Sequence, residues 1–336
     1  MSLCDIIFPE PCHMATSRGT VMSQGDMTYP RRTAMRVFIT GASGHLGSAV
    51  VPALLSAGHE VVGLARSDTS AAAIEKLGAE ARRGDLSDLD TLSAEAAASD
   101  GVIHLAFRHD LMLGGDMAGA AEADLRALRA LADGVDGSGK PLVGTSGTAM
   151  LAMGGIVGRP GTERDAFPSG YRIDAENFVV DLASRGVRSS TIRLAPTVHS
   201  SLDHYGFITV IIAAARRSGY AAYVGEGANR WPAVHTLDAA ALYRLALEKA
   251  PAGARLHAAA DEGVPFQQIA AAIGRNLDIP ARSIGPDDAD NYFGFLGSFA
   301  QMDNPTSSAI TRELLGWAPA HPGLIADLDE GHYFRA

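Results

Sequence analysis

Three glycines at G-x-x-G-x-x-G spacing are the first residues of the chain that could do chemistry. They follow the apolar, β-branched run Arg36–Thr40 and precede apolar residues at helical spacing. Glycines there remove the Cβ atoms that would keep a pyrophosphate away from the free N–H groups of a helix start. The pattern therefore predicts a dinucleotide-binding loop. The loop residues expected at the cofactor are Gly41, Ser43, Gly44, His45, Leu46 and Gly47.

The next expected strand, Glu60–Leu64, indicates which dinucleotide is bound. In NAD-selective proteins an acidic residue closes this strand and accepts from the ribose 2′-hydroxyl. Here the strand continues into Ala65-Arg66-Ser67, without a carboxylate. The guanidinium of Arg66 suits a 2′-phosphate, whereas a solvated surface arginine is the alternative explanation. We expect Arg66 and Ser67 to contact the cofactor and NADP to be preferred over NAD.

Two further groups have the composition of a reactive site. The segment Gly144–Thr148 has glycine directly after its serine, so it is not the G-x-S-x-G nucleophile elbow, and a hydrolase is not predicted. His199, Asp203 and His204 follow a predicted strand and could bind a metal or exchange protons. Because no H-E-x-x-H motif accompanies them, no metal site is expected. Substrate contact or backup acid–base catalysis by His199 or His204 fits their loop position better.

The elements that position these residues alternate regularly between strand and helix up to about residue 200. Such alternation predicts an α/β fold with a doubly wound, mostly parallel sheet, a Rossmann domain. We expect this NADP-binding domain to span residues 35–200, with residues 237–260 returning to it. Beyond residue 200 the alternation loosens, so residues 201–236 and 261–336 are expected to form a smaller C-terminal α/β substrate lobe. The acidic stretch from Asp327 to Glu330 is expected to be solvated surface.

Residues 1–34 differ from the rest of the chain. They contain several prolines, serines and threonines and no periodic apolar pattern, so we expect a flexible extension. Both cysteines, Cys4 and Cys12, lie in this segment, which leaves the expected core without a disulfide or a thiolate metal site.

Bulk composition excludes several classes of function. The chain has 336 residues, is 47% hydrophobic and carries a formal net charge of −10. Such a charge argues against partners that are nucleic acids or anionic membranes. No apolar run approaches the ~18 residues of a membrane span. A cytoplasmic protein with a small-molecule substrate is the simplest expectation.

Several short motifs together resemble a known family. They are G-A-S-G-H-L-G in the loop, G-D-L at residues 84–86, H-L-A at residues 104–106 and a strand that ends in T-S. These resemble the extended and atypical short-chain dehydrogenase/reductases, the NAD(P)-dependent epimerase/dehydratase superfamily. The run at residues 229–235, with Asp-Ala-Ala at 238–240, is similar to an atypical subgroup of epimerases or reductases. The resemblance covers about residues 35–330.

The resemblance implies further cofactor contacts. Asp85 and Leu86 would flank the adenine, with Asp85 accepting from its amino group. Ala106 and Phe107 would lie along the pyrophosphate and ribose, and Thr145 beside them. The segment 195–198, including Pro196 and Val198, would meet the nicotinamide amide.

The catalytic pattern departs from that family. Its extended members carry a serine, then Tyr-x-x-x-Lys, then a glutamate on the same helix. Ser146 and Glu176 match the first and last of these, but counting back from Glu176 places Arg172 at the lysine and Pro168 at the tyrosine. Asp124 stands where the superfamily has a structural asparagine, as in the atypical subgroup. The usual tyrosine acid is therefore missing.

Neighbouring residues suggest substitutes for the missing pair. Arg172 could hold the nicotinamide ribose by its fixed charge, although a guanidinium does not exchange protons. Tyr171, three residues after Pro168, is the first candidate for proton donor, because a guanidinium and an oxidised nicotinamide would lower the pKa of its phenol. A tyrosine packed on the lobe surface is the alternative.

The C-terminal lobe closes over the nicotinamide in this superfamily. The pocket candidates there are Tyr223, Arg230, Trp231 and His235, and the alternative is that they form the core of the lobe. We therefore expect an NADP(H)-dependent oxidoreductase acting on a small carbonyl or alcohol. The rival interpretations are a non-catalytic NADP-binding sensor and a sugar-nucleotide epimerase. A homodimer through residues 120–132 and 176–185 is also expected, as in extended members.

Overall fold

The computed structural model describes residues 34–335, and the residues from Ala34 onward form one compact unit. The flexible extension expected over residues 1–34 therefore lies outside the described residues, apart from Ala34. Within the described part, no helix combines the length and the apolar character that crossing a membrane requires.

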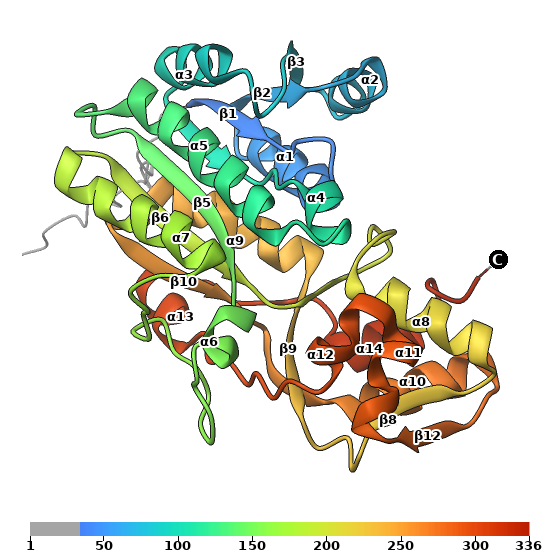
Figure 1. The fold of residues 1–336 in the computed structure, drawn as a ribbon. Coiled ribbons are helices and arrows are strands. Elements are labelled where there is room, and N and C mark those ends of the chain that lie inside the picture. The colour runs from blue at the N-terminus through green and yellow to red at the C-terminus, as the bar shows by residue number, and fades with distance from the viewer. Residues whose placement is uncertain (1–33, 336) are drawn as a thin grey trace, which may run out of the picture. The chain divides into compact units, whose positions relative to one another are not determined.

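A seven-stranded parallel sheet forms the centre of the fold, in the order β10-β6-β5-β4-β1-β2-β3 (Figure 1). Its strands are β1 (Arg36–Thr40), β2 (Glu60–Ala65), β3 (Glu80–Arg83), β4 (Gly101–His104), β5 (Pro141–Gly147), β6 (Arg188–Leu194) and β10 (Ala254–Ala258). The chain winds outward from β1 in both directions, which confirms the doubly wound prediction. The order reverses between β1 and β4, and ligands of such sheets bind in the crevice at the carboxyl ends there.

Helices cover both faces of this sheet (Figure 1). One face carries α1 (Gly47–Ser56) and α9 (Thr236–Lys249), and the other carries α3 (Leu89–Ala98), α5 (Met117–Val135) and α7 (Tyr171–Asp181), which the 3₁₀ turn Leu182–Arg185 extends. Two apolar clusters fill the spaces between helices and strands. The short helices α2 (Asp68–Lys76), α4 (His109–Leu113) and α6 (Ala149–Met153) lie in connections.

The remaining elements pack around a second apolar core that includes Trp231, Phe266 and Phe293. A three-stranded sheet has the order β11-β9-β7 and a two-stranded sheet pairs β12 with β8. The strands are β7 (Thr197–His199), β8 (Ala221–Val224), β9 (Arg230–His235), β11 (Asp261–Pro265) and β12 (Ala281–Ile284). The helices are α8 (Phe207–Ser218), α10 (Phe266–Leu277), α11 (Ala289–Phe293), α12 (Gly297–Ala300), α13 (Ala309–Leu315) and α14 (Leu324–Asp329), with 3₁₀ turns at Pro286–Asp288 and Gly294–Leu296.

Three details differ from the sequence-based expectation. The strand expected to end in Thr-Ser extends one residue further, because the pairing of β5 with β6 continues as far as Gly147 opposite Leu194. Residues 261–336 were expected to belong to the lobe, but Leu315 and Trp317 pack into the core of the large sheet, and the Trp317 indole N–H donates to the Asp238 carbonyl at 2.9 Å. The helix that carries Glu176, expected at the dimer contact over residues 176–185, begins earlier, at Tyr171.

Candidate active site

The glycine loop between β1 and α1 follows a tight path that side chains at two of its glycines would prevent. Gly41 has a φ of +76°, and a Cβ there would lie 2.8 Å from the backbone nitrogen of Ala106. A Cβ on Gly47 would collide with the carbonyl oxygens of Gly41 and Ala42. The amides of His45 and Leu46 donate to no acceptor within the described chain. These open amides at the start of α1 fit a dinucleotide pyrophosphate.

His45 ties the loop to the C-terminal part of the chain. Its Nε2 lies 2.8 Å from Thr236 Oγ1 at the start of α9, and its Nδ1 lies 3.9 Å from Asp203. Burial lowers the pKa of His45, and the charge of Asp203 opposes this shift. Asp203 in turn accepts from the Tyr333 hydroxyl at 3.1 Å. The segment after β7 thus lies directly beside the pyrophosphate position.

The residues expected at the adenosine end of the cofactor follow β2 and β3. Arg66 is exposed at the end of β2 and has no hydrogen bond or ion pair within residues 34–335. Ser67 caps α2 by accepting from the Ser70 amide at 3.1 Å. Asp85 accepts from the Ser87 amide at 3.0 Å, and this bond is the main reason that the pKa of Asp85 is lowered. Leu86 packs against the apolar core on the α3 and α5 side.

A chain of polar contacts joins the carboxyl ends of β1, β4 and β5. Arg172 on α7 donates from Nη2 to the Thr145 carbonyl at 2.7 Å and lies 4.0 Å from Asp124 Oδ2. Asp124 Oδ1 lies 3.1 Å from His104 Nε2, and His104 Nδ1 lies 2.7 Å from Thr40 Oγ1. The structure thus brings together Arg172 and Asp124, which the family resemblance had singled out. The part that His104 plays was missed, although it belongs to the H-L-A motif.

Aromatic contacts extend this group toward the surface. The guanidinium carbon of Arg172 lies 4.1 Å from the ring centroid of Phe107, a cation–π contact. The ring of His109, the first residue of α4, meets Phe107 edge-on at 5.3 Å. Burial lowers the pKa of His109, and the Arg172 charge lowers it further. The residue as a whole is exposed, so the protein surrounds its ring only in part. Sequence reasoning did not identify His109.

The hydroxyl groups at the end of β5 face the interior. Thr145 Oγ1 donates to the His104 carbonyl at 2.6 Å and lies 2.7 Å from the Tyr243 hydroxyl. Ser146 is 3% exposed, and its buried Oγ makes no hydrogen bond of standard geometry, although the Glu176 carboxylate lies nearby. Contact between Ser146 and a substrate would therefore require the side chain to rotate.

Tyr171, at the start of α7, is 56% exposed and makes no hydrogen bond within the described chain.

Glu176, the glutamate of the expected pattern, is an anchor inside the fold. Its carboxylate accepts from Arg193 Nε at 2.9 Å and from Arg255 Nε at 2.8 Å. Burial alone would raise the pKa of Glu176, but the hydrogen bonds and charges of the two arginines lower it below its usual range. This ion-paired cluster holds α7 against β6 and β10.

The histidines that end β7 and β9 converge on Asp327 and not on the Arg172 group. Asp327 Oδ2 lies 2.9 Å from His199 Nδ1 and 3.7 Å from His332 Nε2, and Oδ1 lies 4.0 Å from His235 Nε2. Asp327 is 1% exposed, so the expectation that residues 327–330 are solvated surface is wrong for this residue, because the buried imidazoles hold it inside. His199 is fully buried, whereas His204 is exposed.

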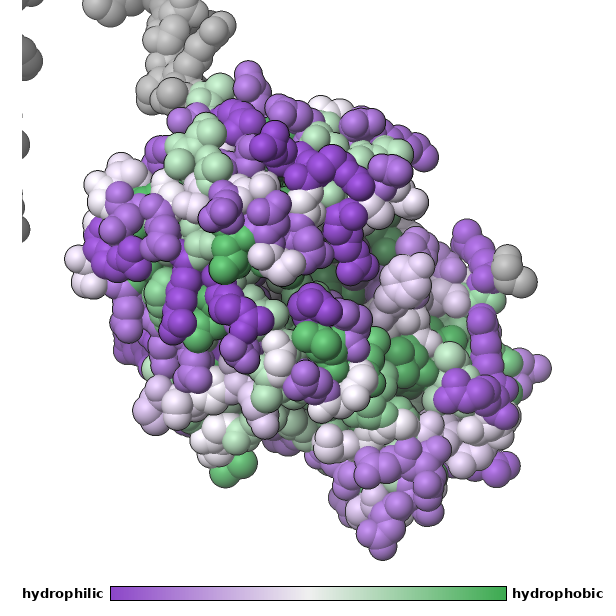
Figure 2. All heavy atoms as spheres, turned by 45° about the horizontal axis from the view of Figure 1, so that its top comes forward, coloured by the Kyte–Doolittle hydropathy of each residue, from purple (hydrophilic) through white to green (hydrophobic). Residues whose placement is uncertain are grey.

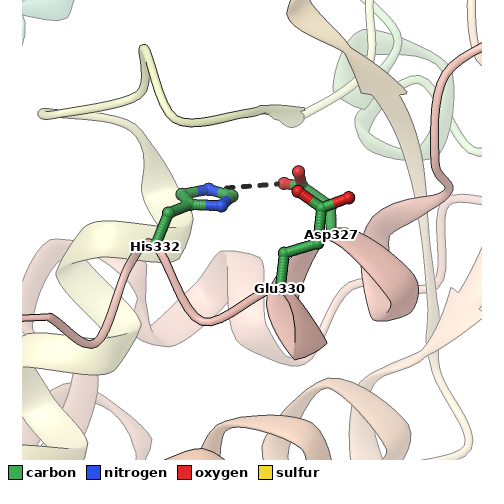
Figure 3. Close-up of side chains that lie close together, drawn as sticks. All are labelled: Asp327, Glu330 and His332. Atoms are coloured by element: carbon green, nitrogen blue, oxygen red, sulfur yellow. Dashed lines mark ion pairs between the residues drawn. The ribbon is translucent and has the colours of Figure 1, made fainter.

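Asp327, Glu330 and His332 offer donor atoms within 4.8 Å of one another (Figure 3). In the close-up, the imidazole of His332 faces both carboxylates. Oxygen and nitrogen donors of this kind suit a divalent cation. Asp327 already bonds His199, however, so the same contacts also fasten the end of the chain to β7 and β9.

The remaining substrate candidates do not reach the Arg172 group. Trp231 is 1% exposed within the second core, and its indole N–H donates to the Phe299 carbonyl at 3.1 Å. Arg230 donates to both carboxylate oxygens of Asp303, at 3.0 and 2.8 Å. Tyr223 lies in β8, which pairs with β12. His235 caps α9 by accepting from the Leu237 amide at 3.2 Å. Of the residues expected at the nicotinamide, Pro196 precedes β7, and Val198 lies in β7, which pairs with β9, and packs on the main core.

Comparisons with known proteins agree with this fold. The chain is 46% identical over 300 residues to the uncharacterized protein C2A9.02 of Schizosaccharomyces pombe, which covers 89% of this chain and 100% of that protein. Two more distant relatives are reductases. The 2'-dehydrokanamycin reductase of Streptomyces kanamyceticus is 31% identical over 264 residues, covering 75% of this chain and 69% of that protein. The 4-hydroxy-2-methyl-3-oxo-4-farnesyl-3,4-dihydroquinoline-1-oxide ketoreductase of Stigmatella aurantiaca is 28% identical over 233 residues, covering 65% of this chain and 66% of that protein.

The solved structure of UDP-glucose 4-epimerase from Thermotoga maritima matches with a TM-score of 0.71 at 18% identity, covering 89% of this chain and 98% of that chain. At this identity the match shows the fold alone. The sequence profile of the NAD dependent epimerase/dehydratase family matches residues 37–258, which spans the glycine loop and the Arg172 group. The chain belongs to the NAD dependent epimerase/dehydratase family, an NAD(P)-binding oxidoreductase fold.

Proposed function

We propose that this protein is an NADP(H)-dependent oxidoreductase that acts on a small, apolar carbonyl compound or the corresponding alcohol. The observation that carries the proposal is a sterically intact glycine cradle that leads to the fixed charge of Arg172 at the carboxyl ends of β4 and β5. The two reductases among the relatives support the same reaction class.

The preference for NADP is part of this proposal. Arg66 directly follows β2, at the strand end that would face the 2′-phosphate of NADP. It makes no hydrogen bond or ion pair within the described chain. A guanidinium can bind a phosphate through two parallel hydrogen bonds, which an unphosphorylated ribose cannot match. No carboxylate at the end of β2 takes the place that NAD-selective proteins give to one.

An apolar substrate is favoured by the side chains around the site. Large apolar residues are exposed in the segments that follow β4, β5 and β7, where a substrate would approach: Leu113, Met153, Val157, Leu202 and Tyr205. Figure 2 shows apolar side chains gathered around the hollow in the middle of the visible face. Exposed apolar groups that border a concave site commonly mark a ligand surface.

A sugar-nucleotide epimerase is less well supported. Such a substrate carries a diphosphate that needs a free cation in the C-terminal lobe. Arg230, the arginine predicted for that pocket, is instead neutralised by two hydrogen bonds to Asp303. A non-catalytic NADP sensor is the second candidate, because proline replaces the tyrosine at residue 168 and the Ser146 hydroxyl is buried.

The cofactor and three groups of residues would have distinct roles in this reaction. Bound NADPH would supply the hydride for reduction of the carbonyl. Arg172, held by Thr145 and Phe107, orients the cofactor's ribose by charge but does not exchange a proton, because its pKa is too high. Ser146 orients the substrate oxygen after rotating toward it. Tyr171, or else His199 or His204, is the sequence-based choice for the proton.

A turnover assay separates the three candidate functions. The purified protein is incubated with NADPH and a panel of aromatic aldehydes, ketones and quinones, and absorbance at 340 nm is followed. Net oxidation of NADPH supports the reductase. Isomerisation of UDP-glucose at constant cofactor would point to the epimerase, and micromolar NADPH binding without any turnover would point to the sensor.

A further inference from the structure

We propose that His109 is the residue that exchanges the proton with the substrate oxygen, in place of the tyrosine that Pro168 replaces. This inference rests on the proposed oxidoreductase function and deepens it. It assigns a catalytic role to a residue in the loop after β4, a strand distant in sequence from the helix that usually carries the acid.

The position of His109 is the first argument. It begins α4 five residues after the last residue of β4, at the edge where the strand order reverses. Its ring touches Phe107, and Phe107 also contacts the Arg172 guanidinium, which is bonded to the end of β5. His109 therefore stands beside the place where a substrate would meet the cofactor's reactive end.

The second argument is that its imidazole is available. The imidazole of His109 has no side-chain hydrogen-bond partner in the described chain, where its hydrogen-bonding contact is with the Phe107 backbone, and the residue is exposed. The rival groups are less well placed. His104 is bonded at both ring nitrogens, and His199 is fully buried against Asp327. Tyr171 is exposed, but no neighbour in the described chain orients its hydroxyl.

The surroundings suit the chemistry. The charged groups that face His109 are Arg172 on α7, Asp124 on α5 and Asp110 on its own helix. Partial burial and then the Arg172 charge lower the pKa of the imidazole, and the Phe107 backbone contact and the two carboxylates only partly oppose them. A neutral imidazole is a base, and its conjugate acid is available at mildly acidic pH.

The proton transfer balances in both directions. In alcohol oxidation, a ring nitrogen takes the hydroxyl proton as the O–H bond breaks and the carbonyl π bond forms, while the carbon loses a hydride to the oxidised NADP. In reduction, the imidazolium returns this proton to the carbonyl oxygen as the carbon gains the hydride. Because His109 is exposed, it exchanges the proton with solvent between turnovers.

The test begins with His109→Gln, assayed with 4-nitrobenzaldehyde and NADPH and with 4-nitrobenzyl alcohol and NADP. Loss of a positioned acid–base group should lower turnover about 10²–10⁴-fold, with NADPH affinity, measured by fluorescence, nearly unchanged. His321→Gln, which changes a histidine bonded to Asp238, is the matched control and should retain activity. Free imidazole should restore part of the activity of His109→Ala, which a purely structural role would not allow.

A second readout does not depend on turnover. In the NMR spectrum of the full chain, the imidazole resonance of His109 is the one that disappears in His109→Gln. Its titration should give a pKa below the ordinary histidine value, and this pKa should rise in Arg172→Met. A pKa of His109 at or above the ordinary histidine value overturns the inference. Full activity of His109→Gln in an active wild-type background overturns it and leaves the reductase standing. A wild-type protein without turnover instead refutes the proposed function.

Discussion

Replacing Arg66 with alanine tests the cofactor preference most directly. The side chain is exposed at the end of β2 and has no partner within residues 34–335. Its removal therefore leaves no buried acceptor unsatisfied, and the free energy of unfolding should stay within about 0.5 kcal/mol of wild type. Any effect of the substitution should fall on the ligand.

The expected size follows from the chemistry of the contact. A hydrogen bond to a charged group contributes about 1.5–3 kcal/mol, and the exposure of Arg66 favours the lower end of this range. NADPH should therefore bind about 10–30-fold more weakly to Arg66→Ala, since 1.4 kcal/mol corresponds to about tenfold. NADH lacks the 2′-phosphate, so its affinity should change less than about twofold.

Fluorescence titrations of both reduced cofactors at low and at 0.5 M salt provide the measurement. The NADPH affinity of the wild type should fall with salt more steeply than that of the variant, because screening weakens exposed charge contacts. Arg82→Ala is the matched control, since Arg82 lies on the neighbouring strand but bonds Glu95 at 3.1 Å. Equal weakening of NADPH and NADH by Arg66→Ala, or tighter binding of NADH by the wild type, would refute the reasoning.

Further predictions concern the cradle, the core and assembly. Gly47→Ala should abolish NADPH binding in the fluorescence titration, because its Cβ would collide with the Gly41 carbonyl; normal affinity would contradict the proposed cradle. Burial lowers the pKa of His257 to about 4, so the unfolded state binds more protons between that value and about 6.5. Stability to urea should fall by up to roughly 3 kcal/mol from pH 7 to pH 4, and less in His257→Gln. Light scattering should show a homodimer formed through α5 and α7, and a 35.0 kDa species at micromolar concentration would count against it.

Local spacing in the sequence was sufficient to predict the glycine turn and the sheet that carries it. The G-x-x-G-x-x-G loop and the alternation of strand and helix depend on residues a few positions apart, and both appear as expected. Arg172 was identified by counting along the family motif and Asp124 by the family resemblance, and the structure places them 4.0 Å apart. Arg66 was identified because it follows the second strand, where NAD-selective proteins carry an acidic residue.

Tertiary structure alone decided what the reactive side chains face. Ser146 lies on the strand predicted for it, yet the pleat turns its hydroxyl toward the buried Glu176. His199 was grouped with its sequence neighbour His204, but its partner is Asp327, 128 residues away. His109 was not identified because its link to Arg172, through Phe107, joins two elements that are distant in sequence, the segment after β4 and helix α7. Periodicity in a sequence determines which residues share an element, whereas contacts between elements depend on how those elements pack.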